Sequence, residues 1–253
     1  MTTHNIIWVV FIMYHKDQLV TRNSYNNDII FKIKDIKENI VILKGYNIRL
    51  VADCYIDDLR KCEEIRNNED NVDLPIQTQN YINGKVLHLD SDVEYLKRSM
   101  KLYEKYQVPC VGYRIDEKDM PNKVNELLKE HRPDILIVTG HDAVDKNGKK
   151  VNSQYFVNCV KQARQYQPSK DYLCIISGAC FSSFKDLINN GSNISSSPGN
   201  VSINVLDPAK VAILVATTPV VEYVDMQKAI NLTSNKNKGM GGIDTKGLAR
   251  KIY

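Results

Sequence analysis

Two apolar segments of this chain are each followed closely by a side chain that can take part in nucleophilic or acid–base chemistry. Residues 135–138 read Ile-Leu-Ile-Val and precede His141, and residues 173–176 read Leu-Cys-Ile-Ile and precede Cys180. Short unbroken runs of this kind predict strands buried on both faces, as in a parallel sheet with helical crossovers. Because parallel strands end at one edge of a sheet, His141 and Cys180 are expected to meet there.

The composition is that of an ordinary globular protein. Thirty-four basic and thirty acidic residues give a net charge of +4, so a surface built mainly to bind nucleic acid is not expected. Six cysteines are present without a CxxC pair or dense spacing, which predicts neither a disulfide framework nor a zinc site. We therefore expect a reducing compartment, no metal and no cofactor.

The first 16 residues are interpreted separately. The run 6–14 is apolar but too short to span a bilayer, and the residues before it lack the Lys or Arg of a secretory signal. Residues 1–16 are interpreted as an apolar leader or as a start assigned too early, with Met13 opening the functional chain; an extra strand and a weak signal segment are the alternatives. No integral membrane segment is predicted.

The rest of the chain divides by its pattern into three regions. Residues 17–56 hold short β-branched segments between Asn, Asp and Gly turn signals, which predicts a small antiparallel β domain. Residues 57–80 are rich in charge and amide side chains, which indicates a helix and linker. Residues 81–253 alternate between strand and helix patterns, so they predict an α/β domain with a three-layer, mostly parallel sheet.

Cys180 is the candidate nucleophile. It precedes a helical pattern that starts near Phe181, so its sulfur is expected to face the positive helix end, which favours thiolate. Gly178 is expected to let a substrate backbone approach, and the N–H of Cys180 is a natural donor to an oxyanion. Cys174 lies inside the same apolar run and is expected only to pack.

His141 is the candidate general base. It follows Gly140, which we expect to line the substrate path, and its ring leaves the sheet edge where it can take a proton from a thiol and return one to a leaving amine. His131 near a helix end and His88 inside a strand are expected to be structural.

A competing interpretation rests on residues 86–93, where an apolar strand ends in a DxDxV pattern. It resembles the first motif of haloacid-dehalogenase-type phosphohydrolases, with Asp90 as nucleophile, Asp92 as acid and Thr139 in the second motif. The match is short, and it does not explain why His141 and Cys180 follow the two predicted strands. We instead expect Asp90 or Asp92 to line a pocket for a basic substrate side chain; capping of the following helix is an equally simple role.

Several motifs together resemble the YabG family of sporulation-specific cysteine peptidases. The resemblance runs from about Met13 to Gly247 and rests on linked segments rather than on one motif. These segments are Gly84–Asp90, Arg132–Leu136, Thr139–Ala143, Gly178–Cys180 and Gly241–Thr245.

The resemblance implies a protease that processes spore coat or cortex-associated proteins in the mother-cell cytoplasm, in association with the forming coat. It carries His141 and Cys180 over as the catalytic pair and implies cleavage beside basic residues. The strand-then-histidine and strand-then-Ala-Cys patterns are also similar, more loosely, to caspase-like peptidases, and the small β domain is expected to be an SH3-like barrel. The remaining alternative is a non-catalytic spore-coat assembly module in which Cys180 is merely buried.

Overall fold

The computed structural model describes residues 14–62, 73–74, 80–142, 148 and 150–253. The predicted leader therefore lies largely outside the described residues. Those within 1–46 and 52–65 form one compact unit, and those within 47–51 and 66–253 form a second one. Each unit has its own sheet and its own buried residues.

The first unit contains a five-stranded sheet in the order β4-β3-β2-β1-β5. β1 pairs antiparallel with β2 and β5, and β2 pairs antiparallel with β3. Alternation buries Phe31 and Ile33 of β2 and Val41 and Leu43 of β3 completely. The strands are β1 (Leu19–Arg22), β2 (Phe31–Lys37), β3 (Ile40–Gly45), β4 (Val51–Tyr55) and β5 (Leu59–Lys61). Closure of this sheet into an SH3-like barrel remains a prediction.

The structure differs from the sequence expectation at the start of region 57–80. Ile56–Asp58 form one 3-10 turn, and Leu59–Lys61 form β5 in place of a helix. Leu59 is 6% exposed, and Arg60 pairs with Thr21 of β1. The buried Leu59 side chain and pairing with β1 are sufficient for this charged segment to join the sheet, because backbone pairing does not depend on side-chain polarity.

The second unit is built around a six-stranded sheet in the order β12-β11-β10-β9-β7-β8. The five strands from β8 to β11 are parallel, and β12 is antiparallel at the edge. The six strands are β7 (Val86–Asp90), β8 (Cys110–Arg114), β9 (Ile135–Thr139), β10 (Cys174–Ser177), β11 (Ile194–Ser196) and β12 (Met240–Gly242). A two-stranded ribbon pairs β6 (Tyr81–Ile82) with β13 (Arg250–Lys251).

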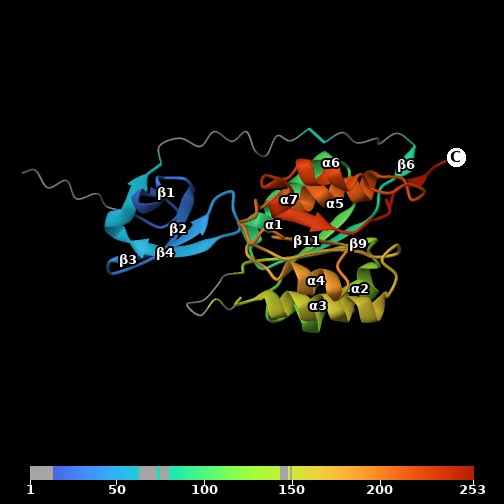
Figure 1. The fold of residues 1–253 in the computed structure, drawn as a ribbon, viewed down its shortest axis with the longest axis horizontal. Coiled ribbons are helices and arrows are strands. Elements are labelled where there is room, and N and C mark those ends of the chain that lie inside the picture. Colours follow the sequence, from blue (N-terminus) through green and yellow to red (C-terminus); the bar gives the residue numbers. More distant parts are fainter. Residues whose placement is uncertain (1–13, 63–72, 75–79, 143–147, 149) are drawn as a thin grey trace, which may run out of the picture. The chain divides into compact units, whose positions relative to one another are not determined.

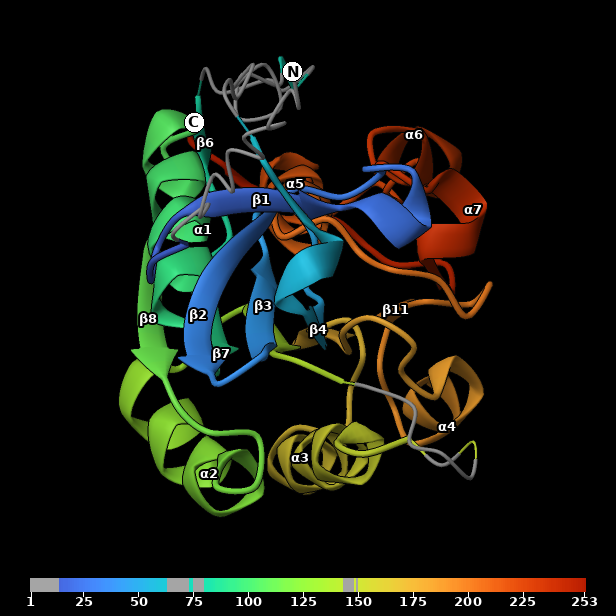
Figure 2. The same cartoon turned by 90° about the vertical axis from the view of Figure 1, so that its left-hand side faces the viewer.

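Helices cover both faces of this sheet, which gives the three layers expected from the apolar runs (Figure 1). One face packs against α1 (Val93–Lys105), α5 (Asp207–Thr217) and α6 (Met226–Asn231), near α7 (Lys236–Gly239). The other packs against α2 (Met120–His131), α3 (Ser153–Tyr166) and α4 (Phe184–Asn189). Figure 2 shows α2, α3 and α4 together on one side of the strands.

Alternating side chains of each central strand supply both cores. In β9, Ile135 and Ile137 join the cluster with α1 and α5, whereas Leu136 and Val138 join the cluster with α2 and α3. All five residues of β9 are buried. A strand with both faces covered places successive side chains in two cores, which is why residues 135–138 read as a continuous apolar run.

Candidate active site

The strands that carry His141 and Cys180 are direct neighbours. β9 and β10 pair in parallel, with Ser177 opposite Val138, and Gly178 N–H donates to the Val138 carbonyl at 2.9 Å. His141 follows the end of β9 and Cys180 follows the end of β10. The parallel register therefore places both residues at the same edge of the sheet, as the sequence pattern predicts.

Hydrogen bonds join the loops that hold these two residues. Asp142, beside His141, accepts a bond from Ser182 Oγ at 3.1 Å, and Ser182 Oγ accepts one from Ala179 N–H at 2.9 Å. Ser153 Oγ also donates to Asp142 and accepts from Ser183 N–H at 3.0 Å. Asp142 is only 3% exposed, so these bonds lie away from competing water and tie the two loops together.

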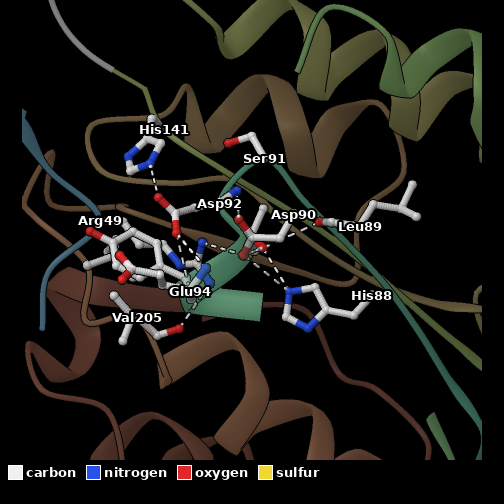
Figure 3. A network of polar contacts seen from close by, with 12 residues as sticks. Arg49, His88, Leu89, Asp90, Ser91, Asp92, Glu94, His141 and Val205 are labelled. Atoms are coloured by element: carbon white, nitrogen blue, oxygen red, sulfur yellow. Dashed lines mark hydrogen bonds and ion pairs between the residues drawn. The ribbon is translucent and has the colours of Figure 1, made fainter. Parts of the chain in front are cut away.

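The His141 ring is oriented by Asp92. Its Nε2 lies 3.3 Å from Asp92 Oδ2 (Figure 3). The centroid of the ring lies 5.5 Å from that of Tyr95. A carboxylate can only accept, so Nε2 carries the proton and Nδ1 is left as the acceptor. Nδ1 is buried and makes no hydrogen bond with any described residue. The ring thus has one nitrogen bonded and one available for proton transfer.

Asp92 also caps α1. Its Oδ1 accepts from Glu94 N–H at 2.9 Å and from Tyr95 N–H at 3.2 Å, while Oδ2 turns towards His141. The capping role considered from the sequence is therefore present, and the same carboxylate holds the imidazole. Because the cap bonds restrict the rotation of Asp92, its Oδ2 is held in place for His141.

Glu117 is a site residue that sequence reasoning missed. Its Oε1 accepts the backbone N–H of His141 at 2.7 Å and the hydroxyl of Ser91 at 2.5 Å. A Cβ on Gly140 would lie 2.6 Å from Glu117 Oε1 and 2.8 Å from Ser91 Oγ. Gly140 thus makes room for this carboxylate, and its expected place in substrate binding stays a prediction.

Cys180 does not lie in the environment expected from the sequence. Its side chain is 0% exposed, and α4 begins only at Phe184, after the Ser183 cap. Its Sγ accepts Ile203 N–H at 3.1 Å and lies 3.8 Å from the Ile203 carbonyl. Burial raises the pKa of the thiol to about 12, although the Ile203 bond and Arg49 act in the opposite direction. The expectation of a resting thiolate is therefore wrong, because desolvation outweighs the donors.

The backbone conformation at position 178 favours glycine. Its φ of +101° lies where side chains are rarely tolerated, and a Cβ there would lie 3.0 Å from Leu187 and 3.3 Å from Ser182. This turn directs the chain from β10 towards Cys180. Its predicted contact with substrate remains a prediction.

Asp90 lies beside this edge but is fully buried. Arg49 Nη1 donates to its Oδ2 at 2.7 Å, Thr139 Oγ1 donates to the same oxygen at 2.8 Å, and Asp92 N–H donates to Oδ1 at 2.9 Å. His88 Nε2 lies 3.6 Å from Oδ2. Burial alone would raise the pKa of Asp90, but Arg49 and the hydrogen bonds hold it well below its usual value. Figure 3 shows the group from close by.

This burial bears on the phosphohydrolase interpretation. A nucleophilic Asp90 would have to meet a phosphate, yet its carboxylate is paired with Arg49 and occupied by Thr139. Among the described residues, no three His, Cys, Asp or Glu side chains gather so that they could hold a metal ion. The structure therefore offers no observation that favours this alternative.

The residues expected to be structural have internal partners. His88 is fully buried between the Tyr103 hydroxyl at 3.0 Å and Thr139 Oγ1 at 2.9 Å, and burial lowers its pKa. His131 Nε2 lies 2.7 Å from the Tyr113 hydroxyl. Cys174 is 1% exposed within the core. These contacts account for each of the three without a catalytic role.

Every helix in the described part of the chain is too short or too polar to cross a bilayer.

Comparison with known proteins identifies the family. The model of the YabG peptidase U57 family matches residues 15–82 and 66–253. The sporulation-specific protease YabG of Bacillus subtilis (strain 168) is 35% identical over 275 aligned residues, which cover 92% of this chain and 95% of that protein. No solved structure matches the chain. The family model and the full-length relative together show that the chain belongs to the YabG peptidase family.

Proposed function

We propose that the chain is a cysteine endopeptidase that processes spore coat or cortex-associated proteins during sporulation and cleaves beside basic residues. Its family comprises peptidases, and its relative is a sporulation-specific protease. The observation that carries the cysteine mechanism is that His141 and Cys180 follow the ends of two adjacent parallel strands, with one imidazole nitrogen bonded to Asp92 and the other unbonded among the described residues.

The proposed reaction begins with proton transfer. His141 Nδ1 takes the proton of the Cys180 thiol, and the sulfur attacks the scissile carbonyl carbon to form a tetrahedral oxyanion. The N–H of Cys180 donates to that oxyanion. The imidazolium then protonates the leaving amine, which departs and leaves a thioester. Water, deprotonated by His141, hydrolyses the thioester and restores the thiol.

The Asp92–His141 contact supports a positioning role for Asp92 in this reaction. With Nε2–H directed at the carboxylate, the tautomer with a basic Nδ1 is favoured, and the imidazolium that forms is stabilised. Tyr95 covers one side of the ring at 5.5 Å between centroids and limits its rotation. Asp92 acts through His141 and contacts no reacting atom in this scheme.

Asp92→Asn is expected to lower kcat by about 10²- to 10⁴-fold with little change in KM, because an amide NH₂ can turn towards Nε2 and favour the wrong tautomer. Asparagine is as good an N-cap as aspartate, so α1 should stay folded. Steady-state kinetics checks the split between kcat and KM. Asp225→Asn, at the α6 N-cap where the side chain accepts from Lys228 N–H at 2.9 Å, is the matched control and should be silent. A similar loss in both variants would contradict the role.

Co-expression with candidate coat proteins tests the function as a whole. New amino termini, sequenced after co-expression with the wild-type chain, should follow basic residues and should be missing with the Cys180→Ala form. Adding a chelator to an active preparation should leave cleavage intact. Cleavage by the Cys180→Ala form would remove the mechanism, and loss of activity with the chelator would point to metal chemistry. A chain that binds coat proteins without cutting any would support the assembly module instead.

The mother-cell cytoplasm, at the surface of the forming coat, is the proposed place of action. The proposed substrates and the relative's sporulation-specific name support it. Fractionation of sporulating cells, with a tagged chain followed to the coat layer, checks it.

A further inference from the structure

Residues 47–51 belong to the second unit, although the residues on either side belong to the first. Arg49 N–H donates to the Ile203 carbonyl at 2.8 Å, and Val205 N–H donates to the Asn47 carbonyl at 3.0 Å. Ile48 and Asn204 are antiparallel bridge partners. Backbone pairing of this kind is how an extended peptide binds to an exposed strand-like edge.

The side chain of Arg49 fills a buried pocket. It is 0% exposed, with Nη1 on Asp90 at 2.7 Å, Nη2 on the Val205 carbonyl at 3.0 Å and its Cζ 5.4 Å from the Tyr95 ring centroid. Its Nε is buried and has no hydrogen-bond partner among the described residues. A permanent core arginine is expected to use its donors fully, often through a two-point pair with a carboxylate. Arg49 instead makes a single-point contact with the acid.

The acid of this pocket is held by groups other than Arg49. Thr139 Oγ1 and Asp92 N–H each donate to the Asp90 carboxylate, at 2.8 and 2.9 Å. Thr139 is the last residue of β9, and Asp92 lies two residues beyond the end of β7, so both donors belong to the same edge of the sheet. The carboxylate is thus kept in place for a cation whether or not Arg49 supplies it.

The pocket adjoins the proposed nucleophile. Ile203 is the shared neighbour, because its N–H donates to Cys180 Sγ at 3.1 Å and its carbonyl accepts Arg49 N–H at 2.8 Å. Tyr95 is a second shared neighbour, because its ring lies near both His141 and Arg49.

We propose that residues 47–51 occupy the substrate groove of the peptidase, with Arg49 in the place of the basic residue before the scissile bond and Asp90 as the acid that selects it. This inference rests on the proposed function and names the substrate contact that would give it specificity. Arg98, which donates to Asn47 Oδ1 at 2.9 Å, then contacts the residue two positions before the basic one.

The segment acts as a competitor of substrates. Beyond Arg49 the chain turns back, because Leu50 N–H donates to the Ile48 carbonyl at 2.8 Å. In this tight turn the chain at the Arg49–Leu50 peptide bond is not extended, whereas attack by a nucleophile requires an extended substrate. A tethered competitor is present at an effective concentration of about millimolar, so it must leave before a protein substrate can bind.

The first test removes the Arg49 side chain from the pocket. It uses the full-length chain and a quenched peptide substrate that contains one arginine. Arg49→Ala is expected to lower KM by about tenfold or more, with kcat nearly unchanged. Agmatine, a small guanidinium compound, should raise the melting temperature of this variant and leave the wild type unshifted, which reports the pocket without activity. Arg250→Ala removes an arginine from an exposed Arg–Asp pair of 2.8 Å and should change neither property.

Removing the acid is the second test, made in the Arg49→Ala background. A twin peptide with citrulline, the neutral analogue of arginine, measures charge recognition. Asp90→Asn is expected to reduce the preference for arginine over citrulline by about 100-fold. An unchanged preference, or an Arg49→Ala variant that is folded but has an unaltered KM and no agmatine shift, would overturn the inference. Failure of the proposed function would give a different result. The Cys180→Ala form would then still cleave, whether or not Arg49 and Asp90 are substituted.

Discussion

Cys180→Ala is expected to lower kcat/KM for protein cleavage by about 10⁴-fold or more, the largest effect of any single change. The proposed reaction forms a bond to this sulfur, and no other group in the scheme replaces it. The sulfur is fully buried and accepts the Ile203 N–H, so removing it costs a hydrogen bond but should leave the fold intact. Initial rates with a protein or peptide substrate, measured against thermal melting of both forms, check the prediction.

Cys174 supplies a matched control for this change. It lies in β10, in the same strand and turn region, and burial raises the pKa of its thiol to about 12, as it does for Cys180. Cys174→Ala is expected to cost about 1 kcal/mol of stability and to retain full activity. Equal losses of activity in the two variants would mean that the effect is one of packing, and the nucleophile would have to be sought elsewhere.

His141→Ala is expected to lower kcat by about 10³- to 10⁴-fold, because the thiol then has no base to take its proton. The pH dependence should change as well. Since burial raises the pKa of Cys180 to about 12, the thiolate fraction without a base should grow about tenfold for each pH unit below that value. The residual rate of the variant should therefore climb steeply from pH 7 to 10. The wild type does not depend on this rise, because His141 takes the proton of the thiol.

The control for His141 is His131, whose ring lies 2.7 Å from the Tyr113 hydroxyl near the end of α2. His131→Ala should reduce stability by about 1 kcal/mol through the lost bond and leave kcat unchanged. A His141→Ala variant with wild-type kcat, or one whose residual rate is flat with pH, would contradict the proposed role. Rate measurements from pH 6 to 10 on both variants decide it.

The parallel sheet could be predicted because its strands are buried on both faces. Residues 135–138 are continuous in apolar character, and they form β9 with helices on either side. The same pattern predicts that the loops after β9 and β10 lie at one edge of the sheet, which accounts for His141 and Cys180. The charged segment 59–61 carried no such pattern, and its strand depends on pairing with β1.

Site residues from loops could not be predicted. Glu117 lies between β8 and α2 and binds a backbone N–H, a contact that has no periodicity in the sequence. Arg49 is separated from Asp90 by 41 positions and meets it only through the pairing of residues 47–49 with 203–205. Asp90 and Asp92 read alike in the sequence, yet one faces the core between Arg49 and Thr139 and the other faces His141.

By itself, the sequence determined which side chains come after the ends of two buried strands, because the spacing of apolar residues and the turn residues beyond them are local properties. Only the tertiary structure decided the state of the thiol and the partner of each aspartate. The pKa of Cys180 depends on how completely its neighbours exclude water, and the ion pair of Asp90 depends on an arginine brought in from a distant segment. Desolvation and charge pairing are sums over everything nearby in space, so no local pattern contains them.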